Sequence, residues 1–257
     1  MARILLWLLA GCVSIAFTVL AYLPASWMAV LLEAQTAGRL TLGDAQGTLW
    51  HGSASIGGAP GARDPVTPLL PGRFSWRLSP LLLLGQVRLQ LENAAALTQP
   101  VSVEGSWSQW QVSAAEVTLP AERLAGLGAP LNTIAPSGRM RLSWSALHLA
   151  RQGQKIDLQG KLQLNIEDIA SRLSPIKPLG AYLVTMDWRG QSAQLVLKTV
   201  KGPLLLNGGG ALENGRLHFS GTAEAAAVDQ EKLANLLNLL GQRRRVAGRD
   251  VIALEFR

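Results

Sequence analysis

The chain has 257 residues and a formal net charge of +7, from 24 basic and 17 acidic residues. This length allows one large domain or two modest ones with a real core. Most Arg residues stand singly between apolar ones, and the only dense block is Arg243–Arg245, so the charge argues against a nucleic-acid-binding protein. The one cysteine, Cys12, excludes an internal disulfide, and the isolated His51, His148 and His218 argue against a metal site.

The first expected element is a membrane anchor over Ile4 to Leu23. This run has no charged residue, and as a helix it would cover roughly 30 Å, the hydrocarbon thickness of a bilayer. Arg3 precedes it, which favours a cytoplasmic amino terminus and an exported body. The alternative is a cleaved signal peptide, but the run exceeds the usual core of about 7–15 residues, and no clear cleavage site follows. We therefore expect residues 1–24 to form a cytoplasmic tip and an uncleaved transmembrane anchor, and residues 25–257 to form the exported domain.

A short membrane-surface helix followed by a hairpin is expected next. Ser26 can cap the helix, and Gly38 can end it. One helical face gathers Trp27, Val30, Leu31 and Ala34. Arg39 then opens an extended run, in which Gly43-Asp44 and Gln46-Gly47 turn the chain into a second strand through Trp50.

Alternation of apolar and polar residues dominates the rest of the chain and predicts strands. The alternating apolar positions include Phe74, Trp76 and Leu78; Val87, Leu89 and Leu91; Val101 and Val103; Met140, Leu142 and Trp144; Leu162, Leu164 and Ile166; Leu195 and Leu197; and Leu217 and Phe219. Turn dipeptides such as Gln152-Gly153, Arg189-Gly190 and Asn214-Gly215 separate several of them. The expected fold is mainly β, a transmembrane helix followed by a curved antiparallel sheet with short helices.

Three segments depart from this alternation. Gly57 to Gly72 is rich in Gly and Pro and is expected to be irregular and mobile. Leu81 to Leu84 is a short, fully apolar run. Trp107 and Trp110 are three residues apart, so either a bulge intervenes or one of them is exposed.

An internal duplication is a further hypothesis. An Arg-Leu-Ser-Pro turn at Arg77 recurs at Arg172, and a Gly-Arg pair at Gly38 recurs at Gly138 and Gly248. The helical leucines of the two halves match at a constant offset, Leu124, Leu127 and Leu131 against Leu233, Leu236 and Leu240. The expected pseudo-repeats are residues 38–137 and 138–257, which would bury each other's open edges. The second helix, from Asp229, is expected to shield apolar sheet surface.

No catalytic, cofactor-binding or metal-binding residues are assigned. Gly208-Gly209-Gly210 precedes an expected strand and hairpin rather than a phosphate-binding helix. The adjacent carboxylates Glu167 and Asp168 precede an expected helix over Ile169 to Leu173, where helix-end electrostatics explains them better than acid/base chemistry. The chain is therefore not expected to be an enzyme.

The sequence resembles type II secretion system protein N along nearly the whole exported part. The resemblance is densest at Leu23 to Ser53, Trp76 to Leu81, Gly138 to Leu149, Leu233 to Gly241 and the final strand. It implies a single-pass inner-membrane protein with a periplasmic body and no catalytic residues. It also implies association with the inner-membrane platform of the secretion system and with the outer-membrane secretin.

Two functions stay open at this point. The first is a non-enzymatic assembly component of the secretion apparatus. The second is a lipid-binding or lipid-transfer β groove that resembles AsmA-like proteins, lined by residues such as Leu89, Leu142, Leu162 and Leu164. An open apolar channel would favour the second function, and a closed core with a free strand edge would favour the first.

Overall fold

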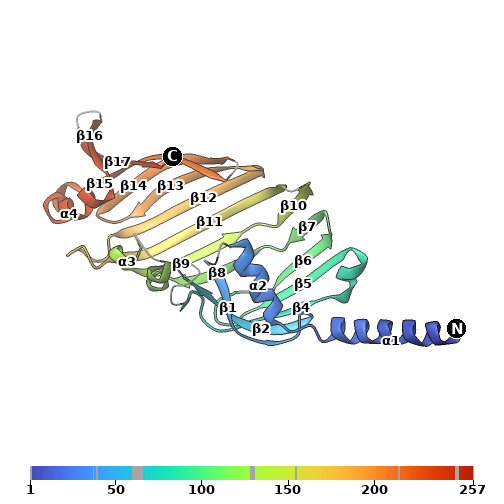
Figure 1. The fold of residues 1–257 in the computed structure, drawn as a ribbon. Coiled ribbons are helices and arrows are strands. Elements are labelled where there is room, and N and C mark those ends of the chain that lie inside the picture. The colour runs from blue at the N-terminus through green and yellow to red at the C-terminus, as the bar shows by residue number, and fades with distance from the viewer. Residues whose placement is uncertain are drawn as a thin grey trace.

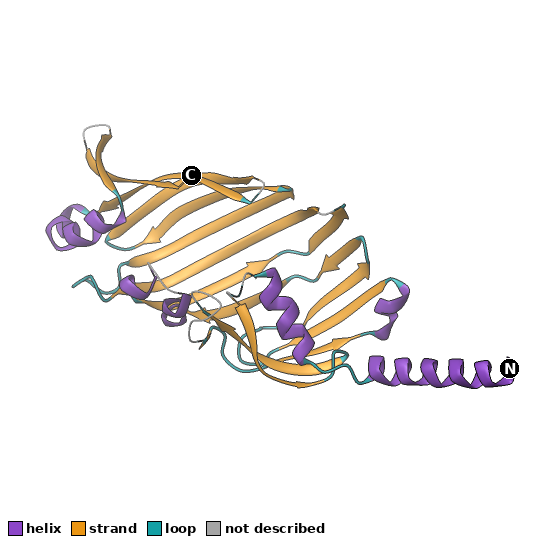
Figure 2. Ribbon diagram, in the orientation of Figure 1, coloured by secondary structure: helices purple, strands orange, loops and turns teal. Residues whose placement is uncertain are grey.

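The computed structural model describes residues 2–36, 38, 40–59, 66–127, 131–153, 155–213, 215–246 and 249–256. Within this part of the chain, a single 17-stranded antiparallel sheet carries a few short helices (Figures 1 and 2). The fold is thus mainly β, as the alternation predicted.

The helical elements are short apart from the first one. They are α1 (Ala2–Ala21), α2 (Ser26–Gln35), η1 (Pro80–Leu84), η2 (Ala121–Leu127), α3 (Leu131–Ile134), η3 (Ala227–Asp229) and α4 (Gln230–Leu240). The strands of the first half are β1 (Leu40–Gly47), β2 (His51–Gly58), β3 (Thr67–Pro68), β4 (Phe74–Leu78), β5 (Gln86–Glu92), β6 (Val101–Ser106), β7 (Gln109–Val112) and β8 (Ala115–Pro120). Those of the second half are β9 (Pro136–Trp144), β10 (Leu147–Gln152), β11 (Lys155–Ser171), β12 (Gly180–Gly190), β13 (Ser192–Lys201), β14 (Leu204–Glu213), β15 (Arg216–Ala225), β16 (Gln242–Val246) and β17 (Arg249–Phe256).

The sheet is a meander in which most strands pair with their sequence neighbours. The long strand β11 lies at its centre, pairing along one edge with β12 and along the other with β10 and β9 in succession. On their other edges, β10 pairs with β7 and β9 pairs with β8. Short connections between antiparallel strands make this local pairing possible. One open sheet therefore extends from β1 to β16.

The cross-strand register separates an apolar face from a polar one. Leu89 lies opposite Val103, which lies opposite Val112, and these belong to the same face as Leu147. Further along, Leu162 lies opposite both Trp144 and Met186. Because side chains alternate along a strand, the intervening polar residues gather on the other face.

Two helices cover the ends of the apolar face. Near α2, Ala25 is buried with Ala54 and Trp76, and Met28 packs against them. At the other end of the sheet, α4 buries Leu233 and Leu236 against Leu179, which precedes β12, and against Leu204 of β14. The predicted shielding by α4 is confirmed for these two leucines; the side chain of Leu240 lies outside the described residues.

The expected cap of α2 is wrong. The helix begins at Ser26 with Ala25 as its N-cap, so Ser26 does not cap it. The predicted apolar face points outward, with Trp27 61% and Val30 68% exposed. Ala25 and Met28 make the contact with the sheet instead, because the buried Trp76 offers an apolar surface on that side.

The hairpin is confirmed, but its turn lies further along the chain. Gly43 pairs with Ser55 and Gln46 pairs with Ser53, so Asp44 and Ala45 form a bulge within β1 rather than a turn. The chain reverses between Gly47 and His51. Arg39 lies outside the described residues.

Two other segments lie outside the alternating pattern. The Gly57–Gly72 segment contains the end of β2 and the short β3, and its residues 60–65 lie outside the described residues. The apolar run Leu81 to Leu84 belongs to the 3-10 helix η1, which the Ser79 side chain caps by accepting a hydrogen bond from the Leu81 N–H.

Glu167 and Asp168 are not followed by a helix; they lie inside β11. The pairing of β11 with β12 shifts between Ile166 and Ile169, and Asp168 has φ +52°, which marks a bulge. The sequence pattern missed this because a bulge interrupts the two-residue period that identifies a strand.

Of the two tryptophans that are three residues apart, Trp107 is the exposed one. It lies in the turn between β6 and β7, whereas Trp110 lies within β7 and is half-buried on the apolar face. The Gly208-Gly209-Gly210 run lies within β14, so it starts neither a helix nor a loop.

The duplication remains a prediction. In the first proposed unit the expected helix is divided into η2 and α3, and residues 128–130 between them lie outside the described part, as do Asn214 and Gly248. The sheet passes from one proposed unit to the other without a break, because β8 pairs with β9.

The N-terminal segment was predicted to cross a membrane as a helix. Among the described residues, no helix is long and apolar enough to cross a membrane, and the predicted crossing over Ile4 to Leu23 is not confirmed.

Candidate functional site

The helix α1 projects away from the sheet at the margin formed by β2 and β4, on the opposite side of the molecule from α4 (Figure 1). Its apolar side chains are largely exposed, including Trp7 at 79% and Phe17 at 73%. Contiguous exposed apolar surface of this kind marks a contact with a membrane or with another protein.

The junction of α1 with the sheet is held by directed hydrogen bonds. The buried Trp50 donates its Nε1–H to the carbonyl of Leu20 at 2.8 Å, and the Leu49 N–H donates to the carbonyl of Leu23 at 2.7 Å. The Ala25 N–H donates to the carbonyl of Gly47 at 3.1 Å. These bonds fix where α1 leaves the body.

Beside these bonds lies a small apolar cavity of about 260 Å³, which we call the junction cavity. Its wall on α1 is formed by Phe17, Leu20 and Ala21. The opposite wall is formed by Thr48, Trp50, His51, Pro80 and Leu83.

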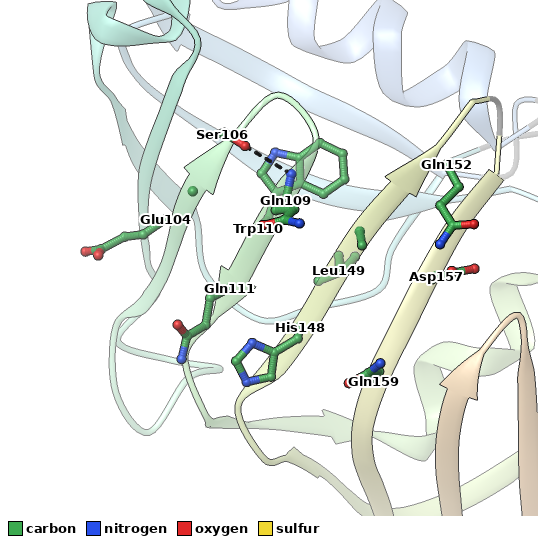
Figure 3. Close-up of a pocket in the computed structure, with 12 residues that line it drawn as sticks. Glu104, Ser106, Gln109, Trp110, Gln111, His148, Leu149, Gln152, Asp157 and Gln159 are labelled. Carbon is green, nitrogen blue, oxygen red and sulfur yellow. Dashed lines mark hydrogen bonds between the residues drawn. The ribbon is translucent and has the colours of Figure 1, made fainter.

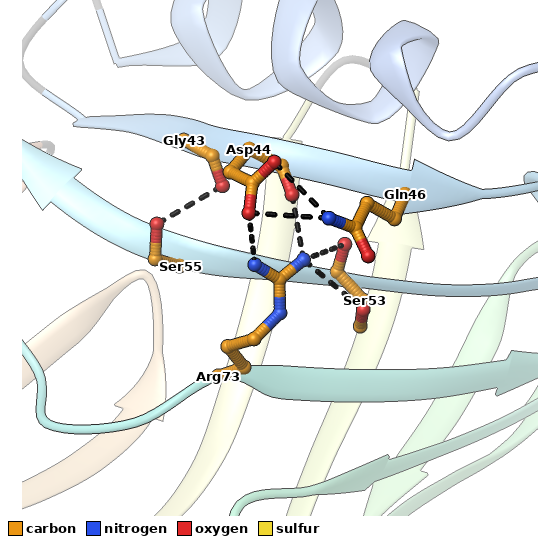
Figure 4. A network of polar contacts seen from close by, with 6 residues as sticks. All are labelled: Gly43, Asp44, Gln46, Ser53, Ser55 and Arg73. Atoms are coloured by element: carbon orange, nitrogen blue, oxygen red, sulfur yellow. Dashed lines mark hydrogen bonds and ion pairs between the residues drawn. The ribbon is translucent and has the colours of Figure 1, made fainter.

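A polar network fixes the β1 bulge close to this junction (Figure 4). The Arg73 guanidinium donates to the Asp44 carboxylate, to the Asp44 carbonyl at 2.6 Å and to Ser53 Oγ at 3.2 Å. The side-chain amide of Gln46 also donates to the Asp44 carboxylate. The hydrogen bonds from Arg73 and Gln46, together with the positive charge of Arg73, lower the pKa of Asp44.

The polar face is hollowed along β2 to β11 by three adjoining cavities, which we call the polar trough. Their volumes are about 330, 400 and 660 Å³. The first two share His51 and Arg77, and the second and third share Glu104. The trough therefore begins at the junction with α1 and crosses half of the sheet.

Half of the twelve residues that line the largest cavity of the trough carry a carboxamide or a carboxylate (Figure 3). A row of directly opposed residues, Glu104, Gln111, His148 and Gln159, runs through it. These groups can donate and accept hydrogen bonds. Within the described part of the chain, no group of three or more His, Cys, Asp or Glu residues could hold a metal ion.

Further along β11, away from the trough, the polar face carries a cluster of ion pairs. Arg139 lies 3.4 Å from Asp168, Arg141 lies 3.3 Å from Glu167, and Lys201 lies 3.9 Å from Asp168. The two carboxylates that were expected at a helix end thus neutralise cations of neighbouring strands. Exposed pairs of this kind contribute little to stability.

The four leucines predicted to line an apolar groove do lie on one face. Leu164 is opposite Leu142 and neighbours Leu162 on the same side of β11, and Leu89 extends this face on β5. All four are half-buried. Trp188 lies on the same face, and its Nε1–H is buried without a hydrogen-bond partner among the described residues. The apolar face is thus only partly covered between α2 and α4.

The polar trough was not predicted from the sequence. His51 and His148, which were set aside as isolated residues, line different parts of it, whereas His218 lies on β15 outside it. The polar positions of each alternating strand were visible in the sequence. Their alignment into one trough depends on the register between strands, which no local pattern encodes.

Comparison with known proteins identifies the family. No curated protein and no solved structure matches the chain at a significant level. Residues 38–252 match the family model described as type II secretion system (T2SS), protein N, which covers nearly the whole sheet. The chain therefore belongs to the type II secretion system protein N family, a family of secretion components.

Proposed function

We propose that this protein is a non-enzymatic inner-membrane component of the type II secretion system. Membership of the protein N family is the observation that carries this proposal. In it, residues 1–24 are the cytoplasmic tip and the membrane anchor, and residues 25–257 are a periplasmic module. This module links the inner-membrane platform to periplasmic and outer-membrane parts of the apparatus, including the secretin.

The exposed apolar surface of α1 supports its placement in the bilayer. Leaving apolar surface in water costs roughly 25 cal/mol per Å², and Ile4, Trp7 and Phe17 are each more than half exposed. Tyr22 and Trp27, 73% and 61% exposed, lie where the chain would leave the bilayer, and such aromatic residues favour the membrane–water interface. Arg3 favours a cytoplasmic amino terminus.

Cysteine labelling in cells tests this topology. In a Cys12→Ser background, we would introduce Ala2→Cys at the start of α1 and Ser108→Cys in the exposed turn after β6. A maleimide that cannot cross the inner membrane should label Ser108→Cys in cells with a permeabilised outer membrane. It should label Ala2→Cys only after the inner membrane is disrupted. Labelling of both positions in intact inner membranes would contradict the proposed anchor.

A secretion assay tests the role in the apparatus. Deletion of the gene should reduce export of the substrates of the type II system, and the full chain should restore it. Residues 25–257 exported without α1 should restore it poorly, because the module would no longer be held beside the platform. Undiminished secretion in the deletion strain would reject the proposal.

Lipid binding by the apolar face is a second candidate function. The observation that favours it is the half-exposed apolar surface around Leu142, Leu162 and Leu164, with the unpaired indole N–H of Trp188 among them. Leu164→Glu should abolish binding of a fluorescent fatty acid to the purified protein, because a charge on the apolar face would lose its hydration. Gln163→Glu, one residue away on the polar face, is the matched control and should bind normally. Equal binding by the two variants would remove the apolar face as a lipid site.

A further inference from the structure

Two cavities of different chemistry meet where α1 joins the sheet. The junction cavity is apolar on its α1 side, where Phe17 and Leu20 line it. The neighbouring cavity of about 400 Å³ in the polar trough is lined by Arg77 and Arg88. His51 and Pro80 belong to both cavities, so the two form one continuous amphipathic site.

The two arginines of this site have no partner within the described part of the chain. Arg77 stands opposite His51 and Gln90, and Arg88 stands opposite Glu104, but neither guanidinium forms an ion pair or a side-chain hydrogen bond there. By contrast, Arg73, Arg141 and Arg244 each form an ion pair with a carboxylate. Two guanidinium groups against the single carboxylate of Glu104 leave the cavity with a net positive charge.

The apolar part of the site continues onto η1. Leu83 and Leu84 are 49% and 79% exposed, and Leu83 shares the junction cavity with Phe17. The exposed Trp107 donates its Nε1–H to the carbonyl of Leu82 at 2.7 Å and holds η1 in place. Exposed apolar side chains beside an exposed indole are typical of protein surface that contacts the membrane–water interface.

We propose that these two cavities bind one anionic phospholipid of the bilayer around α1. The guanidinium groups of Arg77 and Arg88 hold the phosphate, for which their planar donor geometry is suited. The first part of an acyl chain lies between Phe17, Leu20 and Leu83. This site rests on the proposed placement of α1 in the bilayer, and it fixes the orientation of the sheet relative to the membrane surface.

Native mass spectrometry of the full chain in nanodiscs tests the proposal. The nanodiscs contain phosphatidylcholine alone, phosphatidylcholine with phosphatidylglycerol, or phosphatidylcholine with added inorganic phosphate. We expect the wild-type protein to retain one phosphatidylglycerol. The double variant Arg77→Gln/Arg88→Gln loses two charge-assisted contacts, so its retention of phosphatidylglycerol should fall about tenfold or more. Lys198→Gln/Arg216→Gln removes the same charge from exposed positions on β13 and β15 and should retain it normally.

Leu83→Ser tests the apolar half of the site at a half-exposed position, where the fold does not depend on the leucine, and should also weaken retention. Equal retention by the two double variants would overturn the proposal. If the protein retains inorganic phosphate but no phospholipid, the site binds free anions only, and the proposal of a lipid site is overturned. The labelling of Ala2→Cys and Ser108→Cys should not change in Arg77→Gln/Arg88→Gln. A failure of the lipid site is therefore distinguishable from a failure of the membrane anchor.

Discussion

The indole of Trp50 donates a 2.8 Å hydrogen bond to the carbonyl of Leu20, in the last turn of α1. The last four carbonyls of a helix have no partner within the helix, so this bond satisfies one of them. Trp50 itself is only 6% exposed. This bond therefore joins the end of the apolar helix to the first turn of the sheet, between β1 and β2.

This relationship gives the first prediction. Trp50→Phe keeps most of the apolar burial but removes the donor, which should lower the free energy of unfolding by about 0.5–1.5 kcal/mol. Trp50→Ala also leaves a cavity and should cost about 3–5 kcal/mol. Trp107→Phe loses a similar bond at an exposed position, where water replaces it, and is the control. Denaturant unfolding in detergent measures all three, and equal stability of Trp50→Phe and the wild-type protein would disprove the role of the bond.

The second prediction concerns α4. Leu236 is 4% exposed and packs with the fully buried Leu233, whereas Asn235 faces solvent. Leu236→Ala should cost roughly 2–5 kcal/mol, and Leu236→Asp should cost more because the buried charge would gain no partner. Asn235→Asp should leave the melting temperature nearly unchanged. Small and similar effects of Leu236→Asp and Asn235→Asp would mean that α4 is not packed on the sheet in solution.

The third prediction uses the glycines of β14. A Cβ atom on Gly208 would lie 2.5 Å from Cζ of Phe219 and 2.8 Å from the backbone of Gly221, whereas one on Gly209 would meet nothing closer than 3.5 Å. Gly208→Ala should therefore destabilise the sheet by about 1–3 kcal/mol through overpacking. Gly209→Ala, the neighbouring control, should be nearly neutral. Thermal unfolding distinguishes them, and equal tolerance would show that the Phe219 ring does not lie over Gly208.

The fourth prediction is a pH dependence at the β1 bulge. The hydrogen bond from Arg73 is the main reason why the pKa of Asp44 is lowered in the folded protein. A lowered folded-state pKa stabilises the fold at pH values above the unfolded pKa of about 3.9, and the contribution is lost as the pH falls through the folded-state value. Asp44→Asn should therefore be less stable than the wild-type protein at pH 6, and the difference should shrink toward pH 2.

Because Asp44 is exposed, the effect on stability should be small, and NMR titration of its carboxyl group is the sharper measurement. Arg73→Gln should raise the pKa of Asp44 toward its ordinary value. Arg216→Gln, on a distant strand, should leave that pKa as it is. An unchanged Asp44 titration in Arg73→Gln would contradict the network in Figure 4.

Elements with a local pattern could be predicted from the amino-acid sequence alone. A two-residue period placed strands around Trp76, Leu89, Leu142 and Leu164 and assigned one apolar face to them, because successive side chains of a strand must point to opposite sides. A helical spacing of leucines predicted that α4 would cover apolar surface, and Leu233 and Leu236 are indeed buried. The match to the protein N family covers residues 38–252, which include these strands and α4.

Features that depend on contacts between distant segments could not be predicted from local patterns and are seen only in the folded protein. Met28 rather than Trp27 faces the sheet, because Trp76 lies on that side of α2. Glu167 and Asp168 lie in a strand, because β9 and β12 pair with β11 on both sides of its bulge. Arg77 and Arg88 share a cavity beside Phe17 and Leu20 through strand register and through the bond between Trp50 and Leu20. Register and bulges bring together residues many positions apart, and a period measured along the chain carries no information about which strands will be neighbours.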